Sequence, residues 1–133
     1  MKTISILILT AAIAGCRTYD ARLYGTWKSD ADRSVSRLST RHDLSQDKQE
    51  AWRNIFGQMV ITFDKRSFTT ELRGITNSIP YRVLGKDSYS VVIQFCEIDA
   101  PHENILIIRF DDHGSWISTS PADTWEYFRR QTD

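Results

Sequence analysis

The sequence has few cysteines, few prolines and no excess of charge of either sign. Two cysteines in 133 residues cannot form the disulfide framework of a small secreted scaffold. The 17 basic and 17 acidic side chains balance, whereas a nucleic-acid-binding domain would be clearly basic. No apolar run reaches the roughly 20 residues that a transmembrane helix needs. The chain must therefore fold around a hydrophobic core, and its length suits one domain.

Motifs that would indicate catalysis are also missing. The sequence contains no G-x-S-x-G, no P-loop and no paired-cysteine motif. His102-Glu103 and Asp111-Asp112-His113 could bring imidazoles and carboxylates together, and a hydrolase would need His102 or His113 to converge on one cleft. Neither segment has the spacing of a metal motif, and turns commonly use Asp, His and Gly. We therefore predict no enzyme activity, no metal site and no cofactor.

The N-terminus has the features of a removable signal. Lys2 gives a minimal positive region, and the apolar residues from Ile4 to Ile13 are too few to span a bilayer. The segment Ile13-Ala14-Gly15-Cys16 resembles the bacterial lipobox, in which the cysteine receives a diacylglyceryl group and becomes the new N-terminus. The resemblance implies that residues 1–15 are removed and that acyl chains on Cys16 anchor the mature protein to a membrane.

The residues after Cys16 indicate where the domain lies. Residues 16–22 are predicted to be the lipidated cysteine and a tether, which reaches roughly 20 Å when extended. Arg17 rather than Asp follows Cys16. By resemblance to Gram-negative lipoproteins this favours the outer membrane, with the domain facing the periplasm. Acylation of Cys16 would leave Cys96 without an intramolecular partner. Residues 23–133 are predicted to form one domain.

A strand and a helical insertion open this domain. The aromatic and β-branched residues of 23–28 favour a first strand. The insertion covers about residues 31–57, and Ser45 can cap a helix that ends near Gly57. Four apolar residues fall on one face of this helix, namely Ala51, Trp52, Ile55 and Phe56.

From residue 58 onward the apolar period changes from 3.6 to 2, which is typical of strands with one buried face. Turn residues separate the strands, and Ser120–Asp123 are expected to start a one-turn helix before the last strand. We predict a mainly β fold: a small antiparallel up-and-down barrel of about eight strands with one helix inserted after the first. The side chains expected inside are Met59, Ile61, Phe63, Phe68, Leu72, Tyr81, Val83, Tyr89, Val91, Ile93, Phe95, Leu106, Ile108, Phe110, Trp125 and Tyr127.

The layout resembles the lipocalin-like, or calycin, group. Gly25-Thr26-Trp27 matches the G-x-W of the first strand in that group, and Arg129 and Arg130 end the last strand. The resemblance implies that one of these arginines lies over Trp27 and closes one end of the barrel by a cation–π contact. Among such proteins the chain is most similar to the small lipocalin-like lipoproteins of bacteria.

Two classes of function follow from this fold. A small apolar ligand could bind under the helix of Trp52 and Phe56, with polar contacts from Tyr81, Tyr89 and Tyr127. Alternatively, the barrel is filled by its own side chains and its loop face binds an envelope protein, as an inhibitor or immunity-type partner does. Membrane contact is expected through the lipid anchor.

A row of basic residues could add to either function. Arg33, Arg37 and Arg41 recur at a spacing of four, so a helix would place them in one stripe beside His42. The stripe could meet lipid phosphates, or it could be a solvated face that Asp30, Asp32 and Asp43 neutralise.

Overall fold

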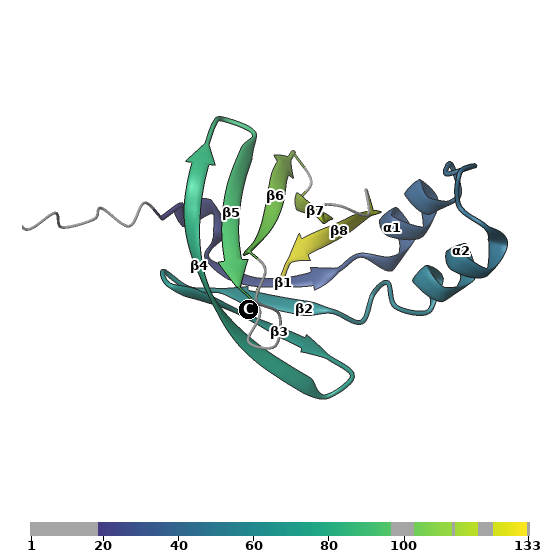
Figure 1. The fold of residues 1–133 in the computed structure, drawn as a ribbon, viewed down its shortest axis with the longest axis horizontal. Helices are drawn as coiled ribbons and strands as arrows, with labels where there is room; N and C mark the ends of the chain where they lie inside the picture. Colours follow the sequence, from purple (N-terminus) through teal and green to yellow (C-terminus); the bar gives the residue numbers. More distant parts are fainter. Residues whose placement is uncertain (1–18, 97–102, 113, 120–123, 133) are drawn as a thin grey trace, which may run out of the picture.

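The barrel predicted from the sequence is present. The computed structural model describes residues 19–96, 103–112, 114–119 and 124–132. Within these residues eight antiparallel strands pair in chain order, and the last strand pairs with the first to close the barrel (Figure 1). The elements are η1 (Ala21–Leu23), β1 (Gly25–Ser29), α1 (Ala31–Leu38), α2 (Gln46–Arg53), β2 (Val60–Phe63), β3 (Ser67–Leu72), β4 (Ile75–Lys86), β5 (Ser90–Cys96), β6 (Glu103–Asp111), β7 (Gly114–Thr119) and β8 (Thr124–Arg130).

On one side of β8 the neighbouring element changes along the strand, from α1 to β1. β1 pairs with the end of β8 from Trp27 opposite Arg130 to Ser29 opposite Phe128. Beyond this point α1 covers the edge of β8, because the Tyr127 amide donates to Ser34 Oγ at 2.9 Å. The Asp30 amide likewise donates to the Tyr127 carbonyl at 2.7 Å. The helix thus satisfies strand groups that an open edge would leave unpaired.

The core lies inside the barrel and is formed by alternate residues of the strands. Its centre is filled by Val91, Ile93, Ile108 and Phe128, all buried. Twelve of the side chains expected inside are buried or pack against this core, namely Met59, Ile61, Phe63, Phe68, Tyr81, Val83, Val91, Ile93, Phe95, Leu106, Ile108 and Phe110. Leu23, Trp27, Ile79 and Phe128 complete the cluster.

The predicted inward residues of β8 are wrong, and so is Tyr89. Phe128 is buried, whereas Trp125 and Tyr127 lie on the opposite face of the strand, toward α1. Aromatic side chains occupy both faces of β8, so alternation alone could not choose between them. Tyr89 is 75% exposed because it lies in the turn before β5.

The helical insertion consists of two helices rather than one. Asp30 caps α1 by accepting from the Arg33 amide at 3.1 Å, and α2 ends at Arg53, before the predicted stop at Gly57. Gly57 has a φ of 87°, and a Cβ there would lie 2.8 Å from the Cβ of Ala31. This close approach holds the start of α1 against the connection from α2 to β2. None of the helices in the described part of the chain is long and apolar enough to cross a membrane.

The domain also begins earlier than predicted. Asp20 is buried and accepts hydrogen bonds from the amide and the guanidinium of Arg22. The contact caps η1, so residues 20–22 belong to the folded domain and not to a tether. The helical turn expected at 120–123 lies outside the described residues.

Candidate functional site

One end of the barrel is closed by η1, Trp27 and Arg130. The Trp27 indole donates to the Leu23 carbonyl at 2.8 Å. The guanidinium of Arg130 lies 4.2 Å from the centre of the Trp27 ring and donates to the carbonyls of Tyr24 and Arg22. Arg129 does not take part, because it points outward and pairs with Asp30 at 2.8 Å. We call this closed side the η1 end; its contacts are those of a structural plug.

The five residues predicted to line an apolar pocket do not converge. Tyr81 and Tyr89 lie toward the η1 end: the Tyr81 hydroxyl donates to the Asp64 carbonyl at 2.6 Å, and Arg22 donates to the carbonyls on either side of Tyr89. Burial raises the pKa of Tyr81 to about 12, consistent with its packing against Phe63 and Phe68.

The other three residues lie toward the opposite end. Phe56 is buried in the turn after α2, and the half-buried Trp52 ring stacks on it at 5.8 Å. α2 packs against α1, which itself packs on β8, so both helices lie at the far end of the long axis from η1 (Figure 1). Tyr127 contacts α1 from the outer face of β8.

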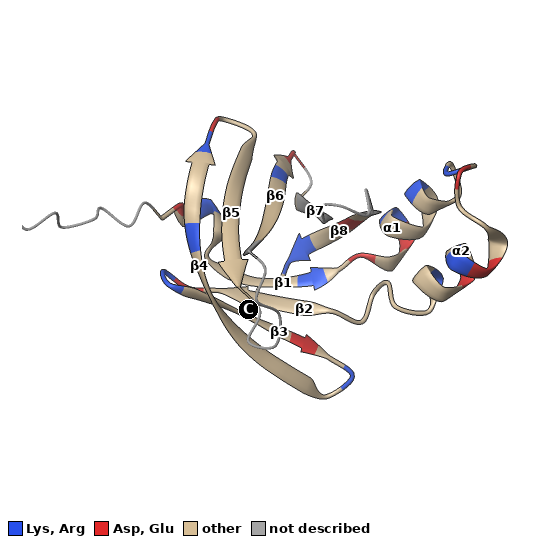
Figure 2. Cartoon of the chain, viewed as in Figure 1, with Lys and Arg blue, Asp and Glu red and all other residues tan. Residues whose placement is uncertain are grey.

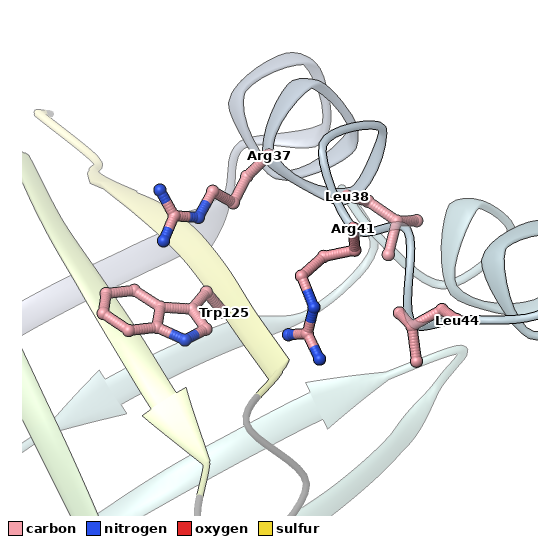
Figure 3. A pocket seen from close by; sticks show the side chains of 5 residues that line it. All are labelled: Arg37, Leu38, Arg41, Leu44 and Trp125. Atoms are coloured by element: carbon pink, nitrogen blue, oxygen red, sulfur yellow. The ribbon is translucent and has the colours of Figure 1, made fainter.

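The outer face of β8 and the adjoining face of α1 form a groove rich in arginine and aromatic side chains. The Arg33 guanidinium lies 4.4 Å from the centre of the Tyr127 ring. Two guanidinium groups lie near Trp125, that of Arg37 at 4.9 Å and that of Arg109 at 5.5 Å. We call the outer surface around these five residues the α1–β8 groove. Figure 3 shows Arg37 reaching from α1 toward the Trp125 ring.

The groove is a hollow that is open to solvent. Its volume is about 450 Å³ where Asp32, Arg33, Ser36, Arg37, Thr40 and Tyr127 line it. A smaller hollow beside it is lined by Arg37, Leu38, Arg41, Leu44 and Trp125 (Figure 3). Arg37 borders both hollows, so its guanidinium is central to this surface.

The basic residues of the groove differ in how they are neutralised. Arg33 pairs with Asp111 at 2.6 Å, and Arg41 pairs with Asp43 at 2.6 Å. Asp30, predicted to neutralise the stripe, pairs with Arg129 instead. Arg37 is exposed and makes no ion pair with any described residue. Its charge is therefore available to an outside carboxylate.

A carboxyl group inside the barrel was missed by the sequence analysis. Glu126 shares the inward face of β8 with Phe128, and Ser29 Oγ donates to it. Ser29 Oγ in turn accepts from the Gly57 amide at 2.8 Å. Burial raises the pKa of Glu126, and the hydrogen bond from Ser29 opposes part of this effect. Because Trp125 and Tyr127 were predicted to point inward, Glu126 between them was expected to point outward.

Of the remaining candidates from the sequence, only some fall within the described residues. Cys96 is exposed and free, and Cys16, His102 and His113 lie outside the described residues. In the described part of the chain no group of three or more His, Cys, Asp or Glu side chains could hold a metal ion.

Comparison with protein-family models gives no match, and comparisons with curated proteins and with solved structures give no significant match either.

Proposed function

We propose that this protein is a lipid-anchored lipoprotein of the bacterial envelope that binds another envelope protein through the α1–β8 groove. The observation that carries the proposal is the position of Trp125 and Tyr127 on the outer face of the barrel beneath three arginines. Trp, Tyr and Arg are the residue types that contribute most to binding energy at protein interfaces.

The charge of the groove indicates the chemistry of the partner. Arg37 is exposed beside the half-buried ring of Trp125. A partner surface with a carboxylate next to an apolar side chain would pair with the guanidinium and cover the ring. The apolar-ligand class has no such support, because the five residues predicted for it are divided between the two ends of the barrel.

The anchor is supported by the lipobox resemblance at Ile13-Ala14-Gly15-Cys16, and the domain that it would carry is a closed antiparallel barrel. The absence of Asp after Cys16 favours the outer membrane, with the domain in the periplasm. Figure 1 shows α1 and α2 at the end of the long axis opposite η1, where the chain enters the domain. An anchored domain would therefore present the groove away from its own membrane, which favours a protein partner over lipid phosphates.

Site-specific photocrosslinking in cells tests this proposal. A photoreactive residue replaces Ser36 or Thr40, which line the groove, and Thr76 on the exposed β3–β4 hairpin serves as the control position. We expect one adduct from the groove positions and none from Thr76. Adducts of equal yield from all positions, or none from the groove, would contradict the proposal.

The partner identified from the adduct is then purified and titrated. Arg37→Ala should weaken its binding about thirtyfold or more, the loss typical of an interface hot spot. Arg53→Ala provides a matched control, since Arg53 is an exposed arginine at the end of α2. Equal affinities for the parent chain and for Arg37→Ala would exclude the groove as the binding surface.

A further inference from the structure

The η1 end carries exposed aromatic and basic side chains around the point where the chain enters the domain. Tyr19 is 47% exposed and Tyr89 is 75% exposed. Lys65 Nζ lies 5.4 Å from the centre of the Tyr19 ring, which places the β2–β3 turn beside Tyr19. Arg22 donates to the carbonyls of Asp87 and Ser88, which places the β4–β5 turn beside η1.

The carboxylates of these two turns accept hydrogen bonds from backbone amides of the same turns. Asp64 accepts from the amides of Arg66 and Ser67, and Asp87 accepts from the amides of Tyr89 and Ser90. These hydrogen bonds lower the pKa of both carboxyl groups. Lys65, Arg66 and Tyr89 of these turns are exposed, as is Lys86 at the end of β4, and Figure 2 shows basic positions beside acidic ones at both turns.

Basic residues at this end are also exposed. Lys65, Arg66 and Lys86 are exposed and form no ion pair with any residue in the described ranges. Tyrosine is enriched where proteins meet lipid headgroups, and lysine and arginine are attracted to anionic lipids. The surface therefore has the composition of a membrane-contact face.

The short connection between Cys16 and the folded domain indicates that the partner of this surface is the membrane. Asp20 is buried, so residues 17–19 alone connect Cys16 to the folded domain and span roughly 10 Å when extended. Given the lipid anchor at Cys16 proposed above, on which this inference rests, the η1 end cannot lie far from the headgroups. We propose that the η1 end docks on the membrane, with Tyr19, Tyr89 and the neighbouring basic residues in the headgroup layer.

Fluorescence of the lipidated protein on vesicles of phosphatidylethanolamine and phosphatidylglycerol tests the docking. In a Cys96→Ser background an environment-sensitive dye is attached at Ser88→Cys, next to Tyr89, or at Gln46→Cys, at the start of α2. Both positions are exposed. We expect a blue shift and quenching by spin-labelled lipid at position 88 and neither at position 46. Equal signals at both positions on vesicle-bound protein would overturn the proposal.

A second variant separates docking from mere proximity. A Gly/Ser linker of about ten residues inserted after Arg17 allows the domain to leave the surface. We expect quenching at position 88 to persist with this linker and to be lost when Tyr89→Ala and Lys86→Ala are added. Loss of quenching with the linker alone would overturn docking. Flotation with the vesicles at high salt reports the anchor separately, because salt screens the basic residues of the η1 end but does not release inserted acyl chains.

Discussion

Two consecutive arginines differ in what they do for the fold. Arg130 lies over Trp27 and donates to two carbonyls, whereas the side chain of Arg129 is 67% exposed and pairs with Asp30 at the surface. Arg130→Gln should therefore lower the free energy of unfolding by about 1 to 2 kcal/mol. Arg129→Gln should change it by less than about 1 kcal/mol. Urea unfolding of both variants measures the difference, and equal losses would contradict a closing role for Arg130.

The carboxyl of Glu126 makes stability depend on pH. Its pKa in the folded protein is raised by burial, so the folded state binds its proton more tightly than the unfolded chain does. The stabilisation of the folded state by this proton is complete below the pKa that Glu126 has in the unfolded chain. It is lost as the pH rises through the pKa that Glu126 has in the folded protein. Glu126→Gln, which keeps a partner for Ser29, should be more stable than the parent at neutral pH, and the difference should vanish below about pH 4.

The measurement is the difference in free energy of unfolding between the two proteins across this pH range. Other carboxyl groups, such as Asp20 with its lowered pKa, titrate in both proteins and cancel. A difference that does not vary with pH would show that Glu126 is not held in a desolvated position.

At the scale of elements, α1 covers the edge of β8 beyond the residues that pair with β1. Ser34 is fully buried and accepts from the Tyr127 amide. Ser34→Ala would leave that amide without its acceptor, and we expect a loss of about 1 to 3 kcal/mol. Ser36→Ala in the same helix is the control, since Ser36 is exposed and should change stability by less than about 0.5 kcal/mol. Similar losses from both variants would mean that the edge contact contributes little.

At the scale of the whole molecule, the anchor proposed at Cys16 would bring the η1 end of the barrel toward the membrane. The parent chain should incorporate labelled palmitate, and Cys16→Ser should not, because serine lacks the thiol on which the thioether forms. Its precursor should also remain uncleaved at this position. Cys96→Ser controls for acylation of the exposed thiol and should label like the parent. Labelling of Cys16→Ser at the parental level would exclude the anchor.

The sequence could predict features that depend on neighbouring residues. Runs of period 2 separated by turn residues specify strands that pair with the next strand in the chain, as β4 pairs with β5 around Asp87. The G-x-W segment and the basic chain end indicated the pair of Trp27 and an arginine, and the structure places Arg130 over that ring. The buried face of most strands followed from the same alternation.

The tertiary structure alone decided features that depend on contacts between distant segments. Trp125 and Tyr127 alternate with Glu126 and Phe128, so local pattern left the phase of β8 open. The pairing of Ser29 with Phe128 and the docking of α1 on the outer face fixed it. This orientation of β8 places two aromatic rings on the outer face, beneath Arg33 and Arg37, and one carboxyl group on the inner face, beside Ser29. The sequence by itself determined the barrel because its strand signals are local; the groove arose only when residues about 90 positions apart came into contact.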